Sequence, residues 1–81
     1  MKPSVGRIVI FHQPESEAFH NGSHEHPAIV NCVWPSMGGD GGINCTVFPD
    51  CSPPQSRTSV PHKSVAAPGS CWWDWPKREV A

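Results

Sequence analysis

The chain of 81 residues contains no leucine and little alanine, the two apolar residues that most favour helices. Its apolar content comes from Val, Ile, Trp and Phe, which suit a pleated sheet. Ten prolines and seven glycines add turns and exclude long helices. We therefore expect an all-β protein with long loops.

Two further absences limit the expected partners. No apolar run approaches the length of a membrane span, and the N-terminus lacks the apolar segment of a signal peptide. The six Lys and Arg residues are scattered, and the formal net charge is only −1, so no basic stripe follows a nucleic-acid backbone. We expect a cytoplasmic protein with four reduced cysteines and no cofactor, whose partner is neither a membrane nor a nucleic-acid polymer.

Five segments have the composition of strands. They are residues 5–12, 28–34, 43–48, 57–62 and the Trp-rich segment after Ser70. The glycine-rich turn at 38–42 joins the second and third segments as a β-hairpin, and residues 13–27 form a long loop with one helical turn near 15–19. A chain this short makes one domain, residues 1–81, with a thin core. This pattern predicts a small five-stranded barrel of the SH3-like or OB-like kind.

Three of the four tryptophans lie within the segment Cys71–Pro76. Because side chains alternate along a strand, Cys71, Trp73 and Trp75 share one face, and Trp72 lies on the other. Only one face can close the core of so small a barrel. The other is then an interface or a ligand site, unless all three indoles fill gaps in a thin core.

A set of polar residues precedes this aromatic segment. The guanidinium of an Arg, two hydroxyls and a His can bind a phosphate, and neighbouring aromatic rings can stack on a base, so the set suits a ligand that carries both. The candidate binding residues are Arg57, Thr58, Ser59, His62, Phe48, Trp72, Trp73 and Trp75. The alternative is that Thr58 and Ser59 are ordinary strand residues and that Arg57 lies along the surface.

Metal binding is the weaker hypothesis for the histidines. His20, His24 and His26 have a spacing that would supply ligands, with Cys45 or Cys51 as a soft partner. However, no pair of cysteines has the short separation of a zinc knuckle, and we expect no metal.

Nucleophilic catalysis also lacks a supporting motif. Ser59 with His62 and Asp50, or Cys51 with His62, can be combined into a nucleophile–base set. No local sequence pattern surrounds either set, so we expect no catalytic residues and no enzyme.

Several short runs together resemble a family of short proteins that bacteriophages and prophages encode. The runs are residues 3–9, 28–30, 43–50, 57–60 and 73–76, and they extend over most of the chain. That family has no established enzymatic motif. Trp72, the cysteines and the His-rich loop are not part of its pattern. The resemblance implies a host-interaction factor in the host cytoplasm, and some phage proteins of this type sequester nucleotide second messengers of bacterial immune signalling as oligomers.

Two functional hypotheses follow. The first is a homo-oligomeric, non-enzymatic protein that sequesters a small nucleotide-derived ligand, since surplus tryptophan in a thin core gains stability between subunits. The second is a protein-interaction or virion-associated module that docks on a host or phage protein through its Trp-rich face.

Overall fold

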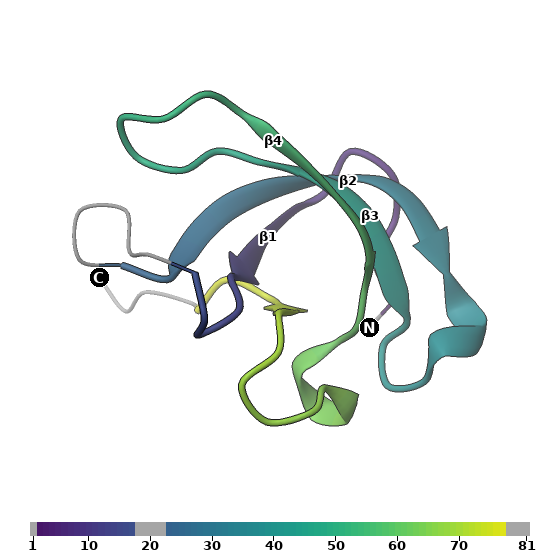
Figure 1. Ribbon diagram of the computed structural model, residues 1–81. Helices are drawn as coiled ribbons and strands as arrows, with labels where there is room; N and C mark the ends of the chain where they lie inside the picture. Colours follow the sequence, from purple (N-terminus) through teal and green to yellow (C-terminus); the bar gives the residue numbers. More distant parts are fainter. Residues whose placement is uncertain (1, 18–22, 78–81) are drawn as a thin grey trace.

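The computed structural model describes residues 2–17 and 23–77 (Figure 1). Five strands are present: β1 (Ile8–His12), β2 (Glu25–Trp34), β3 (Gly42–Val47), β4 (Gln55–Val60) and β5 (Trp72–Asp74). Two short 3-10 turns, η1 (Pro35–Met37) and η2 (Lys63–Val65), precede β3 and β5. The described residues contain no α-helix, which confirms the all-β prediction.

The strands form one antiparallel sheet in the order β4-β3-β2-β1-β5, which curls into a half-barrel (Figure 1). Strands β1 to β4 make a meander, and β5 returns to pair with β1, as it does in barrels of the SH3-like kind. The two ends of the sheet meet at one point, where the backbone N–H of Trp73 donates to the carbonyl of Pro61. Immediately beside it, His62 and Trp73 form an isolated bridge.

The strand boundaries differ from those predicted, most of all at β2. The strand begins at Glu25, inside the segment predicted as a loop, and it contains Pro27. The carbonyl of Pro27 accepts from the N–H of Phe48, just beyond the last residue of β3. The N–H and C=O of a strand residue point to the same side, so the position at which Pro27 lacks an N–H faces the end of the β2–β3 ladder. The proline therefore costs no hydrogen bond to β1.

β1 is shorter than predicted, because the chain turns before it. Gly6 has a φ of +91°, a conformation that breaks an extended run, and its N–H donates to the carbonyl of Val30. In the predicted helical segment, the N–H of Glu17 closes a turn on the carbonyl of Pro14. Residues 18 and 19 of that prediction lie outside the described residues, as does His20.

The predicted hairpin between β2 and β3 is confirmed. Its connection includes Gly39, which has a φ of +58°. A Cβ atom there would lie 2.6 Å from the hydroxyl of Ser64, so glycine is required by both backbone conformation and space. This close approach brings the hairpin connection against η2 and against His62.

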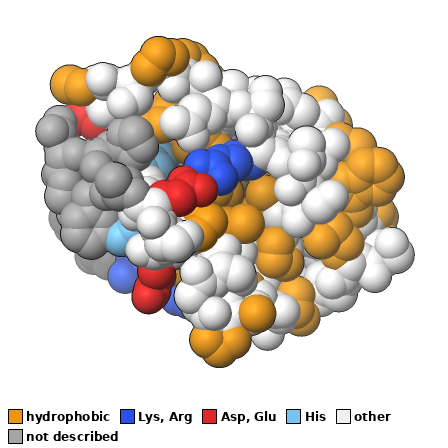
Figure 2. Space-filling view, viewed as in Figure 1, with side chains coloured by type: hydrophobic (Ala, Val, Ile, Leu, Met, Phe, Trp, Pro, Cys, Tyr) orange, Lys and Arg blue, Asp and Glu red, His pale blue; other side chains and the backbone are white. Residues whose placement is uncertain are grey.

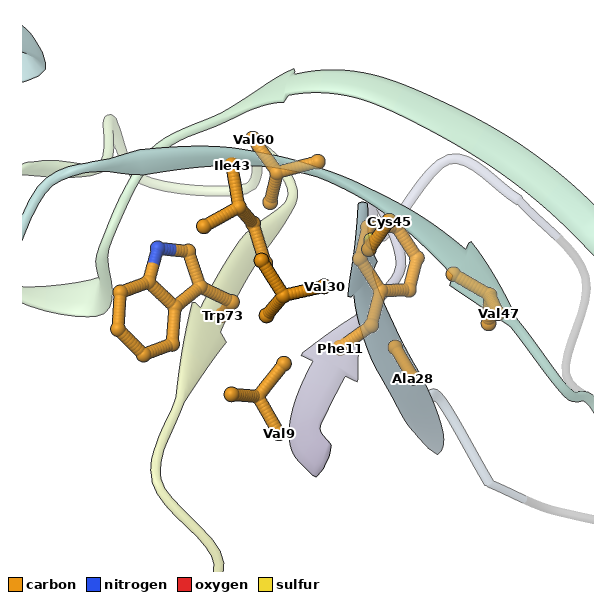
Figure 3. Packing of buried hydrophobic residues seen from close by; sticks show 9 residues of the cluster. All are labelled: Val9, Phe11, Ala28, Val30, Ile43, Cys45, Val47, Val60 and Trp73. Carbon is orange, nitrogen blue, oxygen red and sulfur yellow. The ribbon is translucent and has the colours of Figure 1, made fainter. Parts of the chain in front are cut away.

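The core lies on the concave side of the curled sheet (Figure 3). It consists of nine fully buried side chains: Val9, Phe11, Ala28, Val30, Ile43, Cys45, Val47, Val60 and Trp73. In β1 and β2 they alternate with exposed or half-buried positions, the pattern of a sheet with one face in the core. Trp73 is the largest of them, so a single indole fills much of this thin core.

Candidate functional site

Trp72 lies on the outer face of β5, opposite to the core residue Trp73. Its ring stacks on His12 of β1, with centroids 4.4 Å apart and an interplanar angle of 4°. The pairing of β5 with β1 sets this contact, because Trp72 and His12 are partners in the register. His12 in turn stacks on His24 at 5.6 Å, so three rings form a row.

We call this row of three rings the aromatic shelf, and one cation already lies on it. The ammonium nitrogen of Lys63, from η2, lies 4.9 Å from the centroid of the Trp72 ring. On the His12 side, Glu25 places a carboxylate oxygen 3.5 Å from Nδ1 of His12. That Nδ1 is buried and makes no hydrogen bond. The shelf thus carries a positive charge near one ring and a negative charge near the other.

The shelf borders a groove of about 560 Å³. Its lining combines two indoles and two aliphatic side chains with two lysines and two carboxylates: Ile10, Glu25, Lys63, Trp72, Asp74, Trp75, Pro76 and Lys77. Grooves of this volume accommodate small organic ligands, which bind through apolar walls and a few placed charges. We regard this groove as the candidate site.

Trp73 and Trp75 have different environments. Trp73 has no exposed surface, so it cannot contact a ligand in this conformation. Trp75 is half-buried, meets Trp73 edge-to-face at 5.1 Å and also lines the groove. Its indole N–H donates to Oδ2 of Asp40 at 2.9 Å, and this hydrogen bond holds the pKa of Asp40 below its usual value. Arg7 lies over the Trp75 ring at 5.2 Å.

Arg57 is not part of the groove lining. Its guanidinium donates to both oxygens of Glu17, at 2.9 and 2.6 Å, and lies 5.1 Å from the ring centroid of the core residue Phe11. The hydrogen bonds to Glu17 raise the pKa of Arg57. On the face drawn in Figure 2, a Lys or Arg side chain lies against an Asp or Glu side chain, with hydrophobic side chains beside them. Arg57, the residue predicted to bind a phosphate, is therefore already paired with the carboxylate of Glu17.

The other members of the predicted set are also separated. Ser59 has a φ of +53°, and its N–H donates to Oδ1 of Asn44 at a bulge between β3 and β4. Its neighbour Thr58 is exposed. Phe48 lines a different pocket of about 440 Å³, together with Asp50 and Cys51. Of the eight predicted residues, the structure brings together only Trp72 and Trp75 in the groove.

His62 has its own set of partners beside the groove. Its Nδ1 accepts from the N–H of Ser64 at 3.2 Å and lies 2.8 Å from the hydroxyl of the same residue. Its Nε2 is 3.3 Å from Asp74 and 3.8 Å from Asp40. These contacts make His62 a cap of η2, and they involve neither Ser59 nor Cys51, the nucleophiles considered for it.

The histidines of the metal hypothesis have separate contacts. Nε2 of His24 lies 3.1 Å from the carbonyl of Glu17, and Nε2 of His26 lies 2.6 Å from the side-chain oxygen of Gln13. Within residues 2–17 and 23–77, no three His, Cys, Asp or Glu side chains form a group that would hold a metal ion. All four cysteines are free thiols.

Sequence reasoning missed most of the groove. Ile10 and Glu25 line it, and His12 lies beside it in the stack on Trp72, because of how β1 pairs with β5 and β2. Lys63 contributes because η2 precedes β5. The alternation of β1 would assign Ile10 and His12 to one face, but only the pairing register puts that face beside Trp72.

No known protein family, curated protein or solved structure matches this chain. In the part of the chain that the structure describes, no helix has the length and apolar character needed to cross a bilayer.

Proposed function

We propose that this protein is a non-enzymatic binding module that holds a small nucleotide-derived ligand in the groove beside Trp72. The observation that carries the proposal is the stack of Trp72 on His12 at 4.4 Å, because it makes a rigid, flat aromatic shelf next to the groove. Flat π surfaces bind bases without regard to their sequence identity. The groove also has the volume of a small-ligand site.

Lys63 is the residue that distinguishes a nucleotide from an uncharged aromatic ligand. Its contact with the Trp72 ring is worth about 0.5–1 kcal/mol at an exposed site, whereas a stacked base contributes about 1–3 kcal/mol. A base therefore displaces the Lys63 ammonium from the ring. The displaced ammonium stays within reach of the groove, where it pairs with a phosphate. Arg57 has no part in this site, since Glu17 occupies its guanidinium.

The biological setting belongs to the same proposal. The resemblance to short phage and prophage proteins supports a role in the cytoplasm of an infected host, where the protein removes a nucleotide signal of the immune response. Sequestration requires binding without turnover. The ligand should accordingly be recovered intact when the loaded protein is denatured.

Calorimetry tests this proposal with cyclic mononucleotides, cyclic dinucleotides and ADP-ribose derivatives. We expect at least one to bind, and Trp72→Ala to weaken its binding by at least about 10-fold, as the loss of one stacked base predicts. Lys63→Ala should weaken ligands with a phosphate more than the matching nucleosides. Trp34→Ala is the matched control, since Trp34 is 43% exposed and does not line the groove.

The rival function is docking on a host or phage protein through the same face. It predicts that Trp72→Ala abolishes capture of a protein partner, while the folded wild-type chain binds none of the nucleotides. That combination of results would overturn the nucleotide proposal. Consumption of the ligand during binding would instead indicate an enzyme.

A further inference from the structure

A second pocket adjoins the groove beside Trp72. It has a volume of about 440 Å³ and lies around Pro27 and Phe48, where the N–H of Phe48 donates to the carbonyl of Pro27. Glu25 lines both this pocket and the groove, so the two spaces meet at one side chain. We call the second space the Phe48 pocket. It extends the candidate site beyond the groove.

The Phe48 pocket and the groove each contain an aromatic ring from the outer face of the sheet. Trp72 alternates with the core residue Trp73. Phe48 follows the core residue Val47, so its side chain also points away from the core, and it is 40% exposed. A ring with this exposure offers a face on which a planar group can stack. The site therefore has one stacking position at each end.

Strand pairing sets the separation of the two rings. Phe48 is hydrogen-bonded to Pro27 of β2, and Pro27 lies opposite Ile10 of β1. Ile10 lies opposite Asp74 of β5, the strand that carries Trp72. Neighbouring strands are about 4.8 Å apart, so these three steps place the backbones of the two aromatic residues roughly 14 Å apart. A single base is too small to contact both rings at this separation.

Charge distinguishes the two spaces. The groove is lined by Lys63 and Lys77 as well as by two carboxylates. Among the residues that the structure describes, no Lys or Arg lines the Phe48 pocket, whose lining includes Glu25 and Asp50. Phosphates are attracted to ammonium groups and repelled by carboxylates, whereas carboxylates accept hydrogen bonds from ribose hydroxyls and base amino groups. The Phe48 pocket therefore suits an uncharged nucleoside, and the groove suits the phosphates attached to it.

We propose that the Phe48 pocket binds the second base of a dinucleotide, whose first base stacks on Trp72 and whose phosphates lie in the groove. This inference rests on the proposed function, because it requires a nucleotide in the groove, and it narrows the ligand to one with a base at each end. A mononucleotide fills the groove alone and leaves Phe48 in water. A dinucleotide covers both rings and passes Glu25, where the two spaces meet.

Calorimetry with AMP, ADP-ribose and diadenosine diphosphate tests this assignment. The last two differ only in the second base, and adenine serves as the probe because stacking tolerates every base. We expect diadenosine diphosphate to bind at least about 10-fold more tightly than ADP-ribose, as one additional stacked base predicts. Phe48→Ala should abolish that difference, and Phe48→Trp should retain it.

AMP separates this assignment from the proposed function. Its binding should depend on Trp72 and should be unchanged in Phe48→Ala, which also shows that this variant is folded. Trp34→Ala is the matched control and should leave all three affinities unchanged, because Trp34 is 43% exposed and lines neither space.

Two results would overturn the dinucleotide assignment and leave the proposed function standing. In the first, AMP binds through Trp72 but the second base adds no affinity. In the second, Phe48→Ala weakens AMP as much as diadenosine diphosphate. If none of the three ligands binds the folded wild-type chain, the assignment is also overturned, and the proposed function falls with it when the cyclic nucleotides fail to bind as well.

Discussion

The indole Nε1 of Trp73 donates a 2.8 Å hydrogen bond to the carbonyl oxygen of Gly41, which lies 32 positions earlier in the chain. Both residues are buried. The bond satisfies the single polar atom of the largest core side chain and joins β5 to the β2–β3 connection. The tryptophan-rich segment is thus attached to the β2–β3 connection by a core residue, while Trp72 lies on the outer face.

Trp73→Phe should destabilise the fold strongly. The substitution keeps a ring in the core but leaves the buried carbonyl of Gly41 without its donor, which costs about 1–3 kcal/mol in addition to lost packing. Urea unfolding measures the change. Trp34→Phe is the control, since Trp34 also donates an indole N–H, to Asn44, but at an exposed site. Equal losses in the two variants would contradict a special role for the buried bond.

The Arg57–Glu17 pair should contribute measurable coupling. The two-pronged geometry and partial burial of the pair favour a value near the top of the surface range, about 1 kcal/mol. A double-mutant cycle with Arg57→Lys and Glu17→Gln, measured by chemical unfolding, gives this value. The coupling should decrease at high salt. Additive single effects at every salt concentration would show that the pair is energetically neutral.

The four thiols should differ in reactivity. Burial raises the pKa of Cys45 to about 11, while Cys51 is exposed. At pH 8 the native protein should therefore react with iodoacetamide at Cys51 first, and at least about 100-fold more slowly at Cys45, where the thiolate is scarce. Mass spectrometry of digested samples locates the label. Comparable rates at the two positions in the native state would contradict the buried environment of Cys45, and equal labelling is expected only after denaturation.

The raised pKa of Cys45 also sets the direction of alkaline stability. Because the thiol ionises less readily in the folded chain, its contribution is complete below the unfolded pKa near 9 and is lost as the pH rises towards about 11. Cys45→Ala should reduce this loss in an unfolding series between these pH values. A series with the same slope as the wild-type protein would argue against Cys45 as the source.

Asp40 should stabilise the fold only in its ionised form. Its pKa is lowered chiefly by the hydrogen bond from Trp75, so the stabilisation is present above roughly pH 4 and disappears as the pH falls through the folded-state pKa. Trp75→Phe removes this donor and should raise the pKa of Asp40. Carboxyl NMR titration measures the pKa, and the Trp34→Phe variant should leave it unchanged. An identical titration in Trp75→Phe would show that another group sets the pKa.

Local alternation correctly predicted how the tryptophans divide. In an extended segment the side-chain period is two, so Trp72 and Trp73 must point to opposite faces whatever the strand pairs with. The structure confirms this division, with Trp73 in the core and Trp72 stacked on His12. The all-β class was predictable for a similar reason, because the preference of Val and Ile for strands is a property of each residue by itself.

The grouping of the binding residues was not predictable in the same way. Arg57 and Trp72 lie on different strands, and a residue pattern predicts which side chains share a face only within one strand. The bulge at Ser59 and the contact of Arg57 with Phe11 and Glu17 depend on long-range pairing. β2 likewise begins earlier than predicted. The strand can include Pro27 because this residue lies at the end of the ladder with β3, and that position is set by strand pairing and not by the local sequence.

By itself, then, the sequence determined the strand composition and the opposed directions of adjacent tryptophans, since these follow from propensity and the period of an extended backbone. Only the tertiary structure decided which face became the core and which residues line the groove. The reason is the pairing of β5 with β1, a contact between the two ends of the chain that places Ile10, His12 and Glu25 beside Trp72 and Lys63.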